Sequence, residues 1–290
     1  VHNLPDGQLV ASGSHDGTVR LWSLARPGPP RVQHVIRALV GQVFAIAFSP
    51  DGRFLASTGT DRAIRLFDPQ TGRLLRTLSG IQMIPQGLAF SPDGSRLAAT
   101  STGRSGVLLW DLGNGELESG LEGHGAEAFG ISFSSDGRRL ITASVDRTVR
   151  IWELGRKPHD RSPVELVGHR GVVVAVTYTP DGQLIASAGA DRTIRLWDLR
   201  GGPPRILRGH GGPVLSVVFS PDGQRLASAG GLDRTVRQWS VNTGTLDRTL
   251  MGHADAVHDV DFSPDGHLIA SAGGKGEVRI WDSSTGQVRH

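Results

Sequence analysis

One segment recurs seven times along this chain, and that repetition constrains the fold more than any other feature. The copy at 168–198 reads GHRGVVVAVTYTPDGQLIASAGADRTIRLWD. Its closing aromatic returns at intervals of 42 to 45 residues, at Trp22, Phe67, Trp110, Trp152, Trp197, Trp239 and Trp281. A fixed period of this length indicates an array of like units that stack on one another and share a continuous core.

Each copy has the pattern of antiparallel strands joined by tight turns. Two alternating apolar runs flank a Pro-Asp-Gly or Ser-Asp-Gly turn, as at Pro180-Asp181-Gly182. Proline fixes φ, and glycine accepts the positive φ that such reversals require. The 40 glycines and 16 prolines therefore separate strands and do not mark a low-complexity chain. The sequence predicts an all-β fold.

The Gly-His starts, the Trp-Asp ends and the period together resemble the WD-repeat family. The resemblance implies a seven-bladed β-propeller of four-stranded antiparallel blades, as a single domain over 1–290. We place the blades at about 1–37, 38–79, 80–122, 123–167, 168–208, 209–251 and 252–290. The first and last blades are truncated at the chain ends. Either the ring closes by contact between blades 1 and 7, or the chain is a window from a longer protein, which we favour.

The resemblance also implies a buried hydrogen-bond relay that joins four side chains within a blade. Its members are the His of Gly-His, a Ser or Thr of the second strand, the Asp of the following turn and the Trp of the third strand. A buried indole N–H needs an acceptor, and hydroxyl and imidazole groups can pass the bond on to a carboxylate. Three blades carry all four residues: His124, Thr142, Asp146 and Trp152; His169, Ser187, Asp191 and Trp197; His210, Ser228, Asp233 and Trp239.

The other blades depart from this pattern. Blade 7 has His253, Ser271 and Trp281, with Lys275 where Asp is expected. Blade 3 has Ile81, Ala99 and Arg104 at the His, Ser and Asp positions, and Thr100 is adjacent to Ala99; blade 2 keeps Ser57 and Asp61 but has Leu39 and Phe67 at the His and Trp positions. A half-satisfied relay leaves polar groups without partners. We therefore expect blades 4 to 6 to be the stiffest, and blades 1, 3 and 7 to be softer.

The recurrence of Ser, His and Asp favours a structural role over a hydrolase triad, since an enzyme needs only one site. The chain lacks a Gly-x-Ser-x-Gly elbow, a phosphate-binding loop, a dinucleotide fingerprint and a His-Glu-x-x-His motif. One acidic and histidine-rich cluster indicates a metal site at first sight: His253, Asp255, His258, Asp259 and Asp261. Side chains alternate faces along a strand, so these need not converge. We predict no catalytic residue, no cofactor and no metal; Asp259 and Asp261 share a strand face toward the channel.

Composition narrows the partners and the compartment. The net charge is +3, and the arginines recur within the repeat, which spreads them around a ring. Nucleic-acid binding needs a clustered basic footprint, and this distribution argues against it. There is no cysteine, no membrane-length apolar run and no signal peptide, which leads us to expect a cytoplasmic protein without a membrane partner.

Family members bind proteins or peptides on the rim beside the channel, where side chains are free of the relay. The matching first-strand positions here are Phe44, Gln86, Phe129, Val174, Leu215 and His258. Just before the turn Asp, or its equivalent, stand His15, Thr60, Val145, Ala190 and Leu232. A large apolar set rimmed by arginine favours an interaction surface. The alternative is that the apolar members only fill the space between blades.

The best interpretation is a non-catalytic protein-interaction scaffold. By analogy with relatives of similar arginine usage and near-identical repeats, we expect one module of a larger bacterial signalling or regulatory protein. Two alternatives stay open: an enzyme with a site in the central channel, for which blade 7 comes nearest, and a nucleic-acid-binding propeller.

Overall fold

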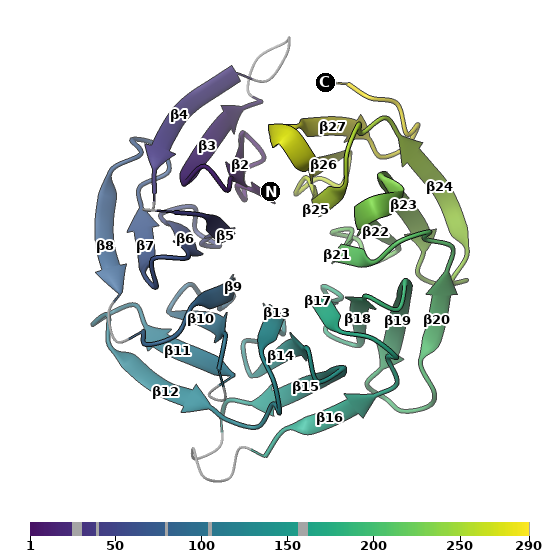
Figure 1. The fold of residues 1–290 in the computed structure, drawn as a ribbon, viewed down its shortest axis with the longest axis horizontal. Coiled ribbons are helices and arrows are strands. Elements are labelled where there is room, and N and C mark those ends of the chain that lie inside the picture. The colour runs from purple at the N-terminus through teal and green to yellow at the C-terminus, as the bar shows by residue number, and fades with distance from the viewer. Residues whose placement is uncertain (25–30, 39–40, 79–80, 104–105, 156–161, 290) are drawn as a thin grey trace.

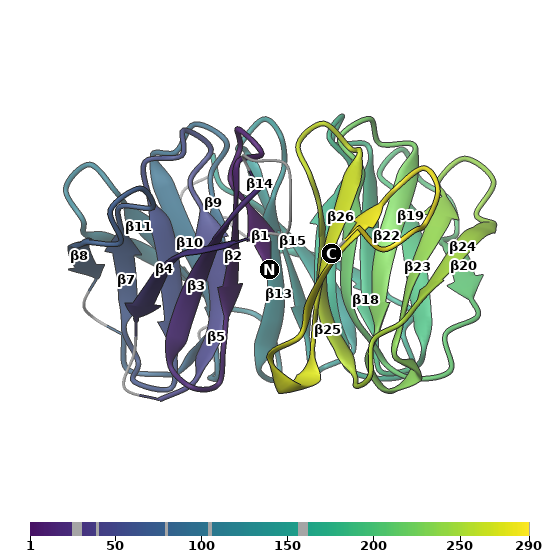
Figure 2. The same cartoon turned by 90° about the horizontal axis from the view of Figure 1, so that it is seen from above.

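The computed structural model describes residues 1–24, 31–38, 41–78, 81–103, 106–155 and 162–289. Seven antiparallel sheets stand around a central channel, and the chain visits them in sequence order (Figure 1). Seen from the side, the sheets stand upright around the ring, with their loops at its two faces (Figure 2). The predicted seven-bladed, all-β propeller is therefore confirmed.

Each blade runs from the channel outward in chain order. The first strands line the channel; they are β1 (His2–Asn3), β5 (Val43–Phe48), β9 (Pro85–Phe90), β13 (Ala128–Phe133), β17 (Val173–Tyr178), β21 (Val214–Phe219) and β25 (Val257–Phe262). The second strands are β2 (Leu9–Gly13), β6 (Leu55–Gly59), β10 (Arg96–Ser101), β14 (Arg139–Ser144), β18 (Leu184–Gly189), β22 (Arg225–Gly230) and β26 (Leu268–Gly273).

The third strands carry the closing aromatic residues. They are β3 (Thr18–Ser23), β7 (Ile64–Phe67), β11 (Val107–Asp111), β15 (Thr148–Glu153), β19 (Thr193–Asp198), β23 (Thr235–Ser240) and β27 (Val278–Asp282). The outer strands are β4 (Arg31–Arg37), β8 (Leu74–Leu78), β12 (Leu117–Leu121), β16 (Val164–Val167), β20 (Arg205–Arg208) and β24 (Leu246–Met251). Two one-turn 3₁₀ segments, η2 (Gly231–Asp233) and η3 (Gly274–Gly276), precede β23 and β27.

The turn between first and second strands is held by its own side chains. In blade 5, Gly182 has a φ of 68°. The hydroxyl of Thr179 donates to Asp181 Oδ1 at 2.5 Å, and the backbone N–H of Gln183 donates to the same oxygen at 3.0 Å. Asp and Thr side chains mimic backbone partners in this way, which fixes the reversal locally.

The hydrophobic core lies between blades. Leu196 of blade 5 packs in one cluster with Val217, Phe219 and Trp239 of blade 6, and all four side chains are buried. The apolar face of one sheet is thus covered by its neighbour, so that no blade is stable alone.

Irregular pairing marks six of the seven first strands. Val43 pairs with Gly59 and Ala45 with Thr58, so Phe44 is an extra residue in β5. The same shift leaves one extra residue in β17, β21 and β25, at Val174, Leu215 and His258. β9 and β13 have equivalent shifts spanning 86–87 and 129–130. Such β-bulges bend a strand and redirect the side chain of the extra residue.

Blades 1 and 7 are in contact across the closure of the ring. Asn3 donates from its backbone N–H to Asp261 at 2.9 Å and from its side chain to Asp261 at 3.0 Å and to the carbonyl of Phe262 at 2.9 Å. The backbone nitrogen of Val1 lies beside the carboxylate of Asp259. Blade 1 has four strands, with a two-residue β1, and blade 7 has three in the described chain, with a further bridge between Trp281 and Val288. The structure therefore contains contact between blades 1 and 7.

Candidate binding site at the channel mouth and the relays behind it

Blades 4, 5 and 6 contain the same chain of hydrogen bonds. In blade 5, Trp197 Nε1 donates to Ser187 Oγ at 2.8 Å, Ser187 Oγ lies 2.8 Å from His169 Nε2, and His169 Nδ1 lies 2.9 Å from Asp191 Oδ2. Blade 4 joins His124, Thr142, Asp146 and Trp152, and blade 6 joins His210, Ser228, Asp233 and Trp239, at distances of 2.7–2.9 Å.

The direction of these bonds follows from which groups can donate. A carboxylate only accepts, so His169 Nδ1 carries the proton; a neutral ring then leaves Nε2 as an acceptor for the Ser187 hydroxyl. Burial lowers the pKa of His169, with Asp191 acting in the opposite sense, and the same holds for the relay histidines of blades 4 and 6. Burial raises the pKa of Asp146, but hydrogen bonds from Thr148 and His124 outweigh it and bring the pKa to about 2. Neutral imidazole therefore links hydroxyl to carboxylate at neutral pH.

Blade 7 differs from the sequence prediction. Lys275 was expected to interrupt its relay, but Glu277 supplies the carboxylate: its Oε2 lies 3.1 Å from His253 Nδ1 and accepts from the backbone N–H of Ala254 at 3.2 Å. Asp191 makes the same two contacts in blade 5. Here η3 alters the turn, with both Lys275 and Gly276 at positive φ, and the longer side chain of Glu277 reaches back to the histidine. The remaining bonds, through Ser271 to Trp281, are 2.6 and 2.8 Å.

Blades 2 and 3 contain broken chains. In blade 1, Trp22 Nε1 donates to Ser12 Oγ at 2.8 Å. Within the described residues, the buried Ser57 Oγ of blade 2 and Trp110 Nε1 of blade 3 have no hydrogen-bond partner. Ala99 stands where Trp110 would find its acceptor. Leu39 and Arg104, expected at relay positions, lie outside the described residues.

Thr100, next to Ala99, makes a different connection. Its hydroxyl accepts from the backbone N–H of Gly87 at 2.8 Å and donates to the carbonyl of Phe129 at 2.6 Å. Blade 3 is therefore joined to blade 4 through β9 and β13, although its relay is incomplete.

All six first-strand candidates line one cavity of about 930 Å³ in the channel. They are Phe44, Gln86, Phe129, Val174, Leu215 and His258. None is buried: Phe44 and His258 are exposed, and the other four are partly exposed. They coincide with the bulged segments of six blades. The apolar members are thus partly exposed to the cavity and are not fully buried between blades.

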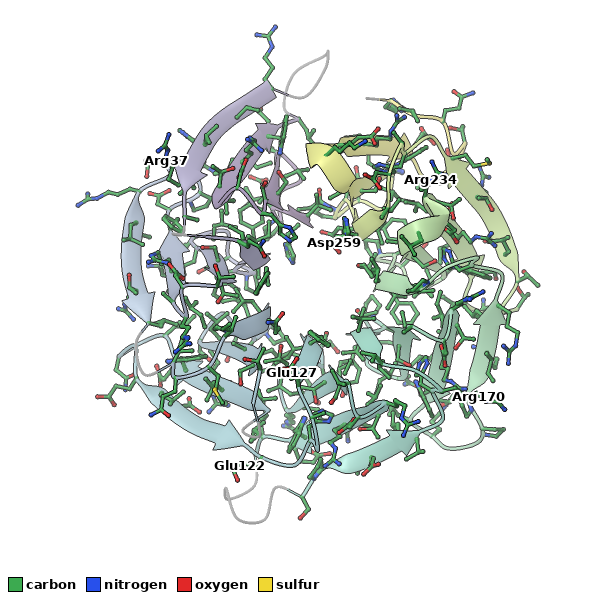
Figure 3. All side chains as sticks on the ribbon, viewed as in Figure 1. Arg37, Glu122, Glu127, Arg170, Arg234 and Asp259 are labelled. Atoms are coloured by element: carbon green, nitrogen blue, oxygen red, sulfur yellow. The ribbon has the colours of Figure 1, made fainter. Side chains whose placement is uncertain are left out.

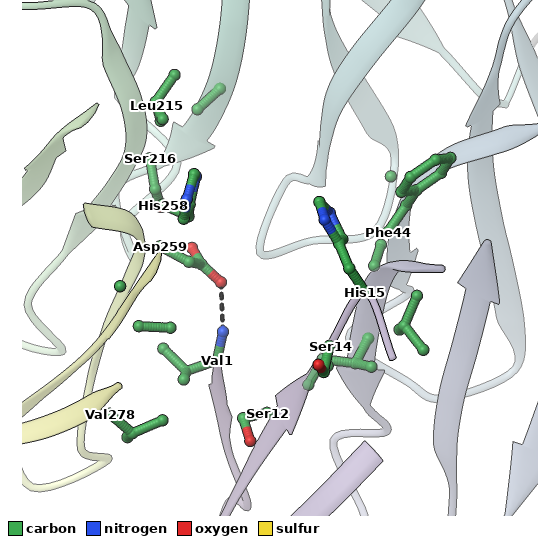
Figure 4. Close-up of a pocket in the computed structure, with 18 of the residues that line it drawn as sticks. Val1, Ser12, Ser14, His15, Phe44, Leu215, Ser216, His258, Asp259 and Val278 are labelled. Atoms are coloured by element: carbon green, nitrogen blue, oxygen red, sulfur yellow. Dashed lines mark hydrogen bonds and ion pairs between the residues drawn. The ribbon is translucent and has the colours of Figure 1, made fainter. Parts of the chain in front are cut away.

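The close-up of this cavity shows Phe44 beside His15 on one side and Leu215 near His258 on the other (Figure 4). The rings of His15 and Phe44 meet edge to face, with centroids 6.4 Å apart. Leu215 packs against η2, because a side chain added at Gly231 would lie 3.0 Å from Leu215. Aromatic and aliphatic groups thus face the channel from separate blades.

The second set of candidates lies on the adjoining loops. Backbone bonds join these loops to those that enter the first strands: Thr60 N–H donates to Gln42 O at 3.1 Å, and Val145 N–H to Glu127 O at 2.9 Å. His15 lines the cavity, whereas Thr60, Val145, Ala190 and Leu232 do not. Leu232 is 76 % exposed.

The acidic and histidine-rich cluster of blade 7 is divided among three tasks. His253 belongs to the relay, Asp261 bonds Asn3, and His258 and Asp259 face the channel, where Figure 3 labels Asp259. We expected both Asp259 and Asp261 to face the channel. Asp259 lines the cavity, whereas Asp261 is not among the residues that line it. No group of three or more metal-ligating side chains is placed to hold an ion in the part of the chain that was described. Among the same residues, no helix is long and apolar enough to cross a membrane.

The fold and its repeated relays define a β-propeller of the Trp-Asp type. The family model for the WD domain, G-beta repeat (WD40), matches residues 1–23, 33–68, 115–153, 161–198, 201–240 and 244–282, which together are most of the chain. The chain belongs to the WD40 family. The matched ranges omit 69–114, the segment that contains Ala99 and Trp110.

Individual relatives match only short parts of the chain. Nuclear distribution protein PAC1-1 of Uncinocarpus reesii is 36 % identical over 77 residues, covering 25 % of this chain and 16 % of its own length. WD repeat and SOCS box-containing protein 1 of Xenopus tropicalis is 40 % identical over 65 residues, covering 22 % and 15 %. Human Coronin-7 is 38 % identical over 64 residues, covering 22 % and 7 %. The chain thus aligns with about a sixth or less of each of these proteins.

Proposed function

We propose that this propeller is a non-catalytic protein-interaction platform, and that a peptide segment of its partner docks at the channel mouth. The observation that carries the proposal is the coincidence of six β-bulges with six side chains that line one cavity. A bulge interrupts regular pairing, and proteins retain such irregularities where a side chain must be aimed.

The chemistry of the cavity suits a peptide with bulky apolar side chains. The cavity is lined by four apolar side chains that are partly or largely exposed to solvent: Phe44, Phe129, Val174 and Leu215. Gln86 and His258 add polar groups among them. Binding surfaces commonly combine a few aromatic or aliphatic contacts with a polar surround.

The relays behind the cavity supply rigidity. Each complete relay ties the loop that precedes a first strand to the second and third strands of the same blade, as His169 does through Ser187 and Asp191. A platform that does not move loses little entropy when a partner binds. The channel-mouth side chains can therefore vary without disturbing the fold.

The expectations about origin, neighbouring domains, location and nucleic-acid binding need evidence of their own. The relatives reported above come from eukaryotes and give no support to the bacterial origin that arginine usage and repeat similarity indicate. A signalling or regulatory neighbour and a cytoplasmic location stay predictions. The nucleic-acid alternative is tested by heparin chromatography, where absence of retention at low salt would exclude it.

Peptide selection followed by mapping tests the proposal. Ligands are selected from a random peptide library on the immobilised propeller, and hydrogen exchange is measured with and without the selected peptide. We expect added protection in 43–46, 128–131, 173–176 and 214–217. Protection confined to the outer strands, or equal selection by a Phe44→Glu, Leu215→Glu variant, would count against the channel mouth.

A further inference from the structure

Arginines recur two residues before the closing aromatic in six blades, and most have a carboxylate partner. Arg20 pairs with Asp16 at 3.1 Å, Arg65 with Asp61 at 2.7 Å, Arg150 with Glu165 at 3.2 Å, and Arg279 with Glu277 at 2.5 Å. The equivalent residues of blades 5 and 6 are Arg195 and Arg237. In the described part of the chain, neither forms an ion pair with a carboxylate.

Arg195 is the more unusual of the two. It is 8 % exposed, and its guanidinium packs over the ring of Trp197. Its Nε, like that of Arg237, has no hydrogen-bond partner in the described structure. A buried cation without a counter-ion is costly, and buried charges are normally paired. Arg237 is less buried.

Two more arginines surround Arg195. On β20, Arg208 pairs with Thr193 and Ile206 pairs with Arg195, so Arg195 and Arg208 are diagonal neighbours on one face of the sheet. The guanidinium of Arg195 also approaches the loop that contains Gly168. Its Nη1 would lie 2.8 Å from a Cβ atom placed at Gly168, and Arg170 is two residues further along this loop. Arg170 and Arg208 are both exposed, and neither has an ion pair among the described residues.

The carboxylate of Asp191, which acts electrostatically on Arg195, already accepts four hydrogen bonds. Asp191 Oδ2 accepts from His169 at 2.9 Å and from the backbone N–H of Arg170 at 2.9 Å, and its Oδ1 accepts twice from Thr193, at 3.1 and 2.7 Å. Burial lowers the pKa of Arg195; Asp191 acts in the opposite sense, and Arg208 and Arg170 lower the pKa further. The positive charge of Arg195 is therefore only partly compensated, by a carboxylate with which it forms no ion pair.

Neighbouring blades show what is missing. Blade 4 places Glu165 opposite Arg150, whereas blade 5 places Ile206 opposite Arg195. Around Arg237 of blade 6, the residues at the corresponding positions are Thr249 and Met251, so no second or third arginine gathers there. The three-arginine arrangement thus belongs to blade 5 among the residues described.

We propose that Arg170, Arg195 and Arg208 of blade 5 form a binding site for a doubly charged oxyanion of the phosphate type. Three guanidinium groups offer several N–H donors to an anion with several acceptor oxygens, and such charge-assisted bonds are the stronger ones in proteins. Figure 3 labels Arg170 at the outer edge of the ring, away from the channel. The site is separate from the channel mouth and does not depend on the function proposed there.

Titration with inorganic phosphate at constant ionic strength tests the site, since general screening by salt is then the same in every sample. The wild-type protein is compared with an Arg170→Gln, Arg208→Gln variant, whose altered residues are exposed. Ile206→Glu gives blade 5 the carboxylate that blade 4 has. Arg205→Gln is the matched control: it removes one charge from the same strand on the opposite face, where Arg205 donates to Asn242 O at 2.8 Å. Circular dichroism verifies that each variant is folded.

We expect phosphate affinity to fall at least about tenfold in the double variant and in Ile206→Glu, and to change less than about twofold in Arg205→Gln. A phosphoserine derivative with blocked termini then separates the two sources of such a group. Binding of both probes assigns the site to a phosphoryl group carried by a partner, and binding of phosphate alone assigns it to the free ion. Equal affinities across all four proteins, or no phosphate binding by the wild type, would overturn the proposal.

Discussion

Glu277 Oε2 lies 3.1 Å from His253 Nδ1 and completes the relay of blade 7 from a position four residues before Trp281. In blade 5 the carboxylate comes from Asp191, six residues before Trp197. The two carboxylates make the same pair of contacts although they start from different places on the chain.

Removal of this carboxylate tests whether blade 7 relies on it. We expect Glu277→Ala to lower the free energy of unfolding by about 1–3 kcal/mol, because His253 and the N–H of Ala254 lose their acceptor. Lys275→Ala is the control and is expected to have little effect, since Lys275 is exposed and forms no relay bond. Urea unfolding measures both; equal losses in the two variants would contradict the role of Glu277.

Completion of the relay changes the expected distribution of stiffness. Blades 4 to 7, rather than 4 to 6, should exchange their backbone amides most slowly, because each has a satisfied chain from Trp to carboxylate. Blade 3 should exchange faster, since the indole of Trp110 has no partner. Hydrogen exchange with slowest protection in blade 3 would be the opposite result.

A serine at position 99 is predicted to repair blade 3. Blade 1 shows the geometry of such a Ser–Trp pair, with Trp22 Nε1 donating to Ser12 Oγ at 2.8 Å. Ala99→Ser should therefore give Trp110 an acceptor and raise the free energy of unfolding by about 1 kcal/mol. Ala98→Ser makes the same change at the next buried position, on the other face, and should destabilise by leaving a buried hydroxyl unpaired. Thermal unfolding of the two variants measures this. A shift of both unfolding midpoints in the same direction would refute the explanation.

Gln238 is a second polar residue without partners. It is 1 % exposed, and both amide atoms lack hydrogen bonds in the described structure. The six equivalent residues before the closing aromatic are Leu or Ile: Leu21, Leu66, Leu109, Ile151, Leu196 and Ile280. Gln238→Leu should raise the free energy of unfolding by about 1–3 kcal/mol, because burying an unpaired amide is costly. A loss of stability in urea unfolding would show that the amide is bonded.

The relays also predict a dependence on pH. Burial holds the pKa of the four relay histidines below their ordinary 6.5. The unfolded chain therefore takes up protons first as the pH falls, so stability is complete above about 6.5 and declines below it, by at most about 1.4 kcal/mol per pH unit for each histidine. The midpoint of urea unfolding between pH 7.5 and 5 measures this. His253→Gln should reduce the slope by one proton; an unchanged slope would contradict it.

The seven-bladed fold could be predicted from the sequence. The contacts of individual side chains and the position of the bulges could not. The period and the turns determine seven blades because each Pro-Asp-Gly reversal is fixed locally. The contribution of Glu277 is hidden, since it depends on how η3 alters the chain path after Gly273. The bulge at Phe44 is equally hidden, because an extra residue in a strand breaks no sequence pattern. The cluster around Arg195 depends on pairing with β20, which brings Arg208 beside it.

The most direct test of the account is the affinity of a selected peptide for three proteins. Phe44→Glu places a charge in the channel mouth, and Val167→Glu places one on β16, where Val167 is 70 % exposed and far from the channel lining. Fluorescence anisotropy should show at least about tenfold weaker binding for Phe44→Glu, equivalent to the loss of one buried aromatic contact, and wild-type affinity for Val167→Glu. Equal affinity in all three proteins would contradict the account and move the binding surface away from the channel.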